Sequence, residues 1–191
     1  MAFGMLPPPE TAAALKRTGV HRVRRQRSKR MAGSRPLSNV ISGLWVGSLS
    51  FQNAHTGDFI NVRYCDDKGR LDGSACRELS HFFRCHLTGR EIRINPRLFL
   101  LLDAARNSLE AGEKPFLLYS GYRSPAYNRQ LARRDGHVAR NSFHTRGMAA
   151  DVALPGVPLA DLEKIGRELG MGGVGKYGQF VHLDVGPIRH W

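Results

Sequence analysis

The first 40 residues constrain the fold of this chain most strongly, because they contain too few apolar side chains to form a hydrophobic core. Three prolines stand in a row at residues 7–9, and residues 16–35 contain nine Lys and Arg with few apolar side chains. Such a segment repels itself and buries too little apolar surface to offset the entropy lost on folding. We therefore predict a disordered basic tail over residues 1–40 and a folded domain over residues 41–191.

The net charge of the chain follows the same division. The whole chain carries +13, and residues 1–50, with nine Lys and Arg against the single acid Glu10, account for +8 of it. A basic tail of this kind could bind an anionic surface, such as a phospholipid or a wall polymer, or could be a solvated extension without a partner. It lacks interleaved aromatic residues that stack on bases, so no specific nucleic-acid partner is expected.

The sequence predicts neither a membrane span nor a clear export signal. No apolar run approaches the roughly 18 residues of a transmembrane helix, which argues against an integral membrane protein. The basic stretch is followed at residues 36–46 by a segment too polar for the apolar centre of a signal peptide.

Strand and helix patterns alternate irregularly from about residue 44 onward. Strands are predicted at residues 44–51, 59–64, 116–119, 149–154 and 180–185, with the first two forming a hairpin around residues 55–58. Helices are predicted at residues 74–86, 95–109, 124–134 and 159–169, from capping residues and prolines at their starts and Gly170 at the last stop. Without strict βαβ alternation, this pattern predicts an α+β fold with an antiparallel sheet flanked by helices.

Three residues in the second half of the chain form a candidate metal site. His144 precedes a predicted strand, Asp151 lies on that strand, and His182 lies on the last predicted strand, while Gly147 permits a tight turn after His144. Two neutral imidazoles and one carboxylate suit Zn²⁺ and leave a fourth position open, as a catalytic zinc site requires. The alternative is that each is a hydrogen-bonded polar residue of the core.

The segments around these residues carry a family resemblance. Residues 142–151 have the pattern Ser-x-His-x-x-Gly-x-Ala-x-Asp, and residues 120–124 read Ser-Gly-Tyr-Arg-Ser. Both resemble the zinc D-alanyl-D-alanine peptidase superfamily, which also contains the hedgehog signalling domain. Val-His-Leu-Asp at residues 181–184, the ending Arg-His-Trp and the stretch at residues 49–57 resemble its murein endopeptidase branch. The resemblance covers about residues 45–191.

This resemblance implies a function, a fold and a location. It implies a hedgehog/D,D-peptidase-like fold in which His144, Asp151 and His182 bind Zn²⁺. It also implies hydrolysis of peptide cross-links in peptidoglycan, as a murein endopeptidase or a D,D- or L,D-carboxypeptidase, in the cell envelope or periplasm. The alternative is a non-catalytic zinc-binding domain that recognises cell-wall peptides or a protein partner. A basic nucleic-acid-binding protein is a weaker third hypothesis.

Two further residues are candidates for substrate binding. The family pattern places Arg123 near the metal, where a guanidinium can hold a carbonyl oxygen, a carboxylate or a developing oxyanion. Ser142, which opens the motif around His144, is predicted to contact substrate. The alternative for Arg123 is a surface position in the loop that enters a helix.

The general base is where the sequence departs from its relatives. One branch of the superfamily has a Glu where this chain has Gln179, and another has a His where this chain has Phe180. Asp184 is the best local candidate, because alternation along a strand puts it on the same face as His182. It is expected either to act as the base or to orient a ligand histidine through its free ring nitrogen. His190 is the next candidate for the base.

Overall fold

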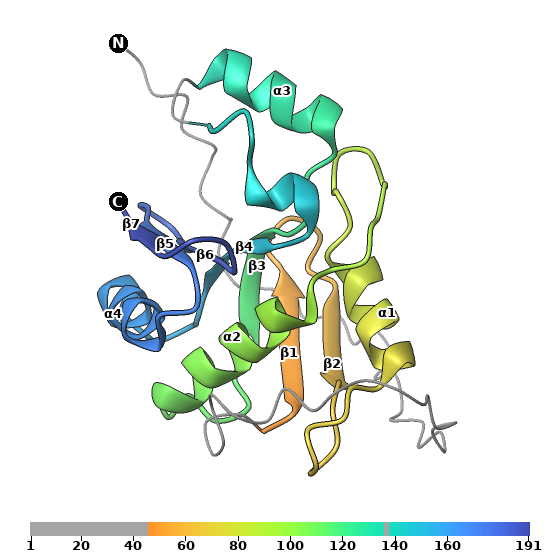
Figure 1. Cartoon of the computed structure of the whole chain (residues 1–191), viewed down its shortest axis with the longest axis vertical. Coiled ribbons are helices and arrows are strands. Elements are labelled where there is room, and N and C mark those ends of the chain that lie inside the picture. Colours follow the sequence, from red (N-terminus) through yellow and green to blue (C-terminus); the bar gives the residue numbers. More distant parts are fainter. Residues whose placement is uncertain (1–45, 136–137) are drawn as a thin grey trace, which may run out of the picture. The chain divides into compact units, whose positions relative to one another are not determined.

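A computed structural model describes residues 46–135 and 138–191 of the chain (Figure 1). The predicted tail over residues 1–40, and the predicted domain start at residue 41, lie outside these residues. Within them the α+β prediction is confirmed, since four α-helices accompany one seven-stranded sheet. No helix of this described part is long and apolar enough to cross a bilayer.

The strands of the described residues form one mixed sheet in the order β2-β1-β3-β4-β6-β5-β7. Their bounds are β1 (Ser48–Asn53), β2 (Phe59–Arg63), β3 (Phe116–Ser120), β4 (Ala149–Ala153), β5 (Gly173–Lys176), β6 (Val181–Asp184) and β7 (Arg189–His190). The predicted hairpin is confirmed: β1 and β2 pair antiparallel, with Gln52 opposite Phe59 next to the turn.

The prediction of an antiparallel sheet is wrong for two of the pairings. β1 pairs parallel with β3, and β5 pairs parallel with β7. Between β1 and β3 the chain passes through β2 and two helices, which gives it the length that a parallel connection needs. Between β5 and β7 it passes through β6, so that β7 returns in the direction of β5 and pairs with it. The pairs β3–β4, β4–β6 and β5–β6 are antiparallel as expected.

The helices start close to the predicted capping residues. Their bounds are α1 (Gly73–Phe82), α2 (Pro96–Ser108), α3 (Pro125–Arg134) and α4 (Leu159–Leu169), with a short 3₁₀ helix, η1 (Phe143–Arg146). Asn95 and Ser124 cap α2 and α3 through their side-chain oxygens, and Gly170 ends α4 at a φ of 60°. The cap of α1 is Asp72 rather than the predicted Ser74, since the Asp72 carboxylate accepts from two backbone N–H groups of the first turn.

The apolar core occupies one face of the sheet, and the predicted metal ligands of the strands lie on the other face. Helix α2 packs against α4 and β1, and α4 packs against β5 and β6. Val152 of β4 and Leu183 of β6 are fully buried in this core. Because side chains alternate along a strand, their neighbours Asp151 and His182 lie on the opposite face. Figure 1 shows η1 and α3 near the end of the sheet where β3 ends and β4 begins.

Candidate metal centre

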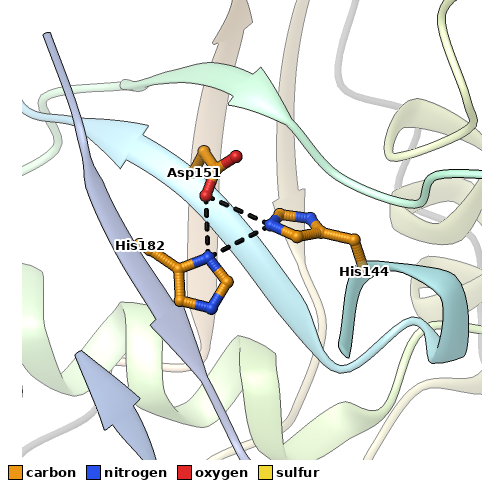
Figure 2. Close-up of side chains that lie close together, drawn as sticks. All are labelled: His144, Asp151 and His182. Carbon is orange, nitrogen blue, oxygen red and sulfur yellow. Dashed lines mark hydrogen bonds and ion pairs between the residues drawn. The ribbon is translucent and has the colours of Figure 1, made fainter. Parts of the chain in front are cut away.

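The three predicted metal ligands lie together in one buried cluster (Figure 2). Asp151 and His182 are directly opposite each other in the β4–β6 ladder, and His144 reaches them from η1. Asp151 Oδ1 lies 2.8 Å from His182 Nδ1 and 3.1 Å from His144 Nε2, and the two nitrogens are 3.1 Å apart. Each residue has less than a tenth of its surface exposed. The structure therefore brings together the residues that the sequence motif singled out.

The turn around His144 is built by the small and polar residues of its motif. The Ser142 hydroxyl accepts a hydrogen bond from the His144 backbone N–H at the start of η1. Gly147 ends η1 with a φ of 63°, in the left-handed region that favours glycine. A Cβ there would also lie 3.0 Å from the carbonyl oxygen of Arg93. Ser142 thus supports the turn that carries His144, and its predicted contact with substrate stays a prediction.

Hydrogen bonds on the outer side of each ring fix the tautomers of the two histidines. His144 Nδ1 lies 2.7 Å from the carbonyl oxygen of Gly121, which can only accept, so this nitrogen carries the proton. His182 Nε2 lies 3.0 Å from Asp184 Oδ2 and donates to it in the same way. In the neutral rings, the nitrogens that face Asp151 therefore present lone pairs.

The centre therefore has the chemistry of a cation site. Two imidazole lone pairs and a carboxylate oxygen face one another at about hydrogen-bond distance, and the neutral rings place no hydrogen between them. These lone pairs repel one another until a proton or a metal ion binds between them. A tetrahedral ion with metal–ligand bonds of 2.0–2.1 Å separates neighbouring ligand atoms by about 3.3 Å, which is within a few tenths of an ångström of the separations here. The residues present thus fit zinc in ligand type, tautomer and spacing.

The surroundings also favour the charge states that metal ligands need. Burial would raise the pKa of Asp151, but His144, His182 and Arg123 outweigh it and hold that pKa well below its usual range. Burial lowers the pKa of His144, which keeps its ring neutral at neutral pH. Burial also opposes a charge on His182, but the bonds to Asp151 and Asp184 raise its pKa. A proton therefore competes with a metal ion most strongly at His182.

Asp184 is the most heavily bonded residue around the centre. It is completely buried, and besides His182 it accepts hydrogen bonds from the backbone N–H groups of Gly173 and Gly186. Arg189 donates to both of its oxygens, at 3.2 and 2.6 Å. Burial would raise the pKa of Asp184, but these bonds outweigh it and lower that pKa below its usual range. The carboxylate is thus a fixed anion that orients the His182 ring.

Arg123 contacts the centre from the segment that follows β3. Its Nε donates to Ser120 Oγ at 2.8 Å, and its Nη2 donates to Asp151 Oδ2. The arginine therefore holds the carboxylate oxygen that faces away from the histidines and leaves Oδ1 toward them. Its side chain is 15% exposed, and Nη1 is used in neither bond.

His190, the other candidate for the base, is exposed on β7. Of the two positions where relatives carry a base, Gln179 is exposed in the turn between β5 and β6. Phe180 packs instead between Tyr177 and Tyr119, with ring centroids 4.9 and 5.6 Å away.

The sequence analysis missed two C-terminal residues of the site, although their ending motif had been noted. The Arg189 guanidinium, bonded to Asp184, lies over the rings of Phe143 and Trp191 at 4.8 and 5.0 Å. The Trp191 ring lies 5.3 Å from that of His182. Trp191 also lies against β5, where a Cβ on Gly175 would come within 2.4 Å of its indole. The pairing of β7 with β5 places these residues beside the centre.

Comparison with known proteins finds relatives of the part of the chain that contains this site. The family model described as peptidoglycan L,D-endopeptidase MepK matches residues 44–191. The peptidoglycan L,D-endopeptidase MepK of Escherichia coli K12 is 38% identical over 145 residues, which cover 75% of this chain and 79% of the relative. The probable peptidoglycan L,D-endopeptidase MepK of Haemophilus influenzae is 31% identical over 145 residues, which cover 75% and 77%.

Among solved structures, the Serratia marcescens L-Ala D-Glu endopeptidase ChiX aligns with 58% of this chain and 86% of its own, at 21% identity. The TM-score is 0.35, which is too low to bear on the fold or the function.

Proposed function

The chain belongs to the peptidoglycan L,D-endopeptidase MepK family, and from this membership we propose that it hydrolyses peptide cross-links of peptidoglycan as a zinc-dependent peptidase. The resemblance to the zinc D-alanyl-D-alanine peptidase superfamily is thereby confirmed at the level of the family. The observation that carries the proposal is the buried cluster of His144, Asp151 and His182, whose converging lone pairs require a cation.

In this proposal His144 Nε2, Asp151 Oδ1 and His182 Nδ1 hold the ion. Zinc bound there supplies a Lewis acid that polarises the scissile carbonyl group and lowers the pKa of water. The carbonyl of Gly121 and the carboxylate of Asp184 keep the two rings in the tautomers that this requires.

Arg123 has two roles in the proposed reaction. Through Nη2 it holds Asp151 in the orientation that directs Oδ1 toward the histidines. Through Nη1 it can donate to the scissile carbonyl oxygen as negative charge develops there, which is the interaction that most stabilises such a transition state. Since Asp151 already neutralises part of its charge, Arg123 acts as an oriented donor more than as a free cation.

We assign Asp184 to positioning rather than to proton transfer. A general base needs a pKa near the working pH and a free lone pair that can reach the reacting water. Both oxygens of Asp184 are occupied by donors, and its pKa is shifted downward. His190 stays the predicted candidate for the base.

The proposal also fixes where the protein acts and what it binds. Because peptidoglycan lies in the cell envelope, we propose that the protein acts there. We propose residues 41–191 as the catalytic domain, which binds the peptides of peptidoglycan. Residues 1–40 are proposed as a disordered extension whose net positive charge holds the enzyme near anionic surfaces.

Incubation of the full-length protein with intact sacculi tests this function. Cross-linked muropeptides should decrease and monomers should increase in chromatography of the digested wall, and a chelator should abolish the change until zinc is restored. His182→Ala, which removes one proposed ligand, should be inactive. A zinc-loaded wild type that leaves the muropeptide profile unchanged would instead favour a non-catalytic domain that binds wall peptides.

A further inference from the structure

Four aromatic side chains stand in a row on the face of the sheet that carries the metal ligands. Phe180 lies two residues before His182, so alternation puts both side chains on that face. The Phe180 ring is 5.6 Å from that of Tyr119 on β3 and 4.9 Å from that of Tyr177 at the end of β5. Trp191 extends the row, because its Nε1 donates to the Tyr177 hydroxyl at 2.8 Å. We call Tyr119, Phe180, Tyr177 and Trp191 the aromatic row.

The outer half of the aromatic row is held in place and yet open to solvent. The backbone N–H of Tyr177 donates to the carbonyl oxygen of Phe180 at 2.9 Å, which closes the turn between β5 and β6. The Trp191 indole covers Gly175, and its backbone N–H donates to the carbonyl oxygen of Val174 at 3.3 Å. Tyr177 is nevertheless 40% exposed and Trp191 49% exposed. Held aromatic rings of this kind offer contact area at a low cost in conformational entropy.

The aromatic row reaches the metal centre at its most open side. His182 is 8% exposed, whereas His144 and Asp151 are 1% and 2% exposed. The ring of Trp191 lies 5.3 Å from the ring of His182. A substrate that reaches an ion held by these ligands from the side of His182 therefore passes Trp191.

The chemistry of the outer rings favours an apolar partner. The polar atoms of Trp191 and Tyr177 are joined to each other in one hydrogen bond, so the two residues present mainly ring carbon to solvent. Ring carbon attracts aliphatic groups through the hydrophobic effect and dispersion. The surface therefore suits a methylene chain better than a charged or strongly hydrated group.

A peptide cross-link carries such a chain next to its amide bond. An amide that joins two peptides side by side needs a residue with a second amino group, and that amine stands at the end of an aliphatic side chain. The sugars of the glycan strand are joined to the same peptides through several residues, each about 3.3–3.6 Å long when extended. Near the ion, the group that meets the aromatic row is thus the diamino acid and not a sugar.

We propose that Trp191 and Tyr177 form an apolar subsite that binds the methylene chain of the diamino acid on the amine side of the scissile bond. The inference rests on the proposed function, because it takes the peptide cross-link as the substrate. Phe180 and Tyr119 support the Tyr177 ring by packing in line with it. Each methylene group that is fully buried on these rings should raise affinity about fourfold.

Matched substrates test the subsite in the reaction. Two synthetic cross-linked dimers, identical except that the side chain of the diamino acid is shorter by two methylene groups in one, are cleaved by full-length zinc-loaded protein. The wild type should prefer the longer chain about tenfold in kcat/KM, since the rings stay partly exposed. Equal kcat/KM for the two dimers would overturn the subsite and leave the peptidase function standing.

Variants of Tyr177 locate the preference, because Trp191 also contacts His182 and Arg189. In Tyr177→Ala the preference should fall severalfold, through a higher KM for the longer dimer with zinc content unchanged. Tyr177→Phe keeps the ring and should keep the preference. Phe59→Ala removes an aromatic ring of β2 that is 61% exposed, and is the matched control. A preference that is the same in Tyr177→Ala and in Phe59→Ala would refute the assignment.

A binding measurement separates failure of the subsite from failure of the proposed function. The chain has two tryptophans, so Trp45→Phe leaves Trp191 as the only one. Dimers in which CH₂ replaces the scissile amide nitrogen cannot be hydrolysed, and each is titrated into this zinc-loaded variant. The longer dimer should shift Trp191 emission to shorter wavelength and bind about tenfold more tightly than the shorter one. Equal affinities, or unchanged emission, would overturn the subsite. Tighter binding of the longer dimer, with no cleavage of its amide counterpart by the wild type, would retain the subsite and reject the peptidase function.

Discussion

Substitution of Asp184 by Asn separates orientation of a ligand from proton transfer. Oδ1 of Asp184 accepts from Gly173 and Gly186, whereas Oδ2 accepts from His182 Nε2 at 3.0 Å and from Arg189 Nη2 at 2.6 Å. An asparagine that keeps the two backbone bonds must turn its NH₂ group toward His182 and Arg189, so that a donor meets donors. The opposite orientation would turn NH₂ toward the two backbone N–H groups, which is no better.

A change of tautomer relieves this mismatch. His182 can accept from the new NH₂ group only by moving its proton to Nδ1, the nitrogen that faces Asp151. Zinc affinity should then fall about 10–100-fold, as when the outer partner of a ligand histidine is removed. The variant should also lose roughly 2–3 kcal/mol of unfolding free energy, because a buried charged hydrogen-bond network is broken. The loss is no larger because Arg189 is partly exposed and water replaces part of its lost bond.

Competition with a chromophoric chelator gives the zinc affinity, and turnover is measured at saturating zinc. We expect weaker binding and a turnover that zinc largely restores. Asp161→Asn, which changes an exposed acid in the first turn of α4, is the control for the loss of one charge. If zinc affinity is unchanged and saturated turnover falls by about 10²–10⁴-fold, Asp184 is the general base and its assignment to positioning is wrong.

Three other measurements check the centre and the domain boundary. His182→Ala should abolish stoichiometric zinc in metal analysis, and a variant that retains one zinc per chain would refute the ligand set. Deletion of residues 1–40 should leave the melting temperature and the zinc content unchanged, whereas a large fall in melting temperature would show that the segment belongs to the folded domain. Gly121→Ala places a Cβ 2.6 Å from the carbonyl oxygen of Phe83, so it should cost roughly 1–3 kcal/mol of unfolding free energy and weaken zinc binding. Gly178→Ala, with nothing within 4 Å of the new Cβ, should do neither in the same assays.

Local chemistry explains which parts of the fold could be predicted from the sequence. Asn95-Pro96 and Ser124-Pro125 combine a capping side chain with a proline in the first turn, and both helices begin there. The proximity of two of the three predicted metal ligands was predictable for a related reason: His144, Asp151 and the residues that turn the chain between them stand within one short motif. Signals of this kind act over a few residues, and tertiary contacts do not override them here.

The elements that the sequence did not predict lack such signals. Strand β5 contains two glycines in four residues, and β7 has only two residues. The glycines of β5 are explained by what covers them: a Cβ on Gly173 would meet Arg189, and one on Gly175 would meet Trp191. The two positions therefore require glycine because residues near the C-terminus pack against them, and no pattern within the strand reveals this contact.

The role of Asp184 depends on the same long-range pairing. Its position two residues after His182 predicts, by strand alternation, that the two side chains meet, and they do. Spacing alone leaves a carboxylate in that place free to be either a base or an anchor. Arg189 favours the proposed role of an anchor, since a guanidinium bonded to both carboxylate oxygens stabilises the anion and lowers the proton affinity that a base requires. The choice thus rests on β7 pairing with β5, and a change in that pairing should alter zinc affinity before it alters any proton transfer.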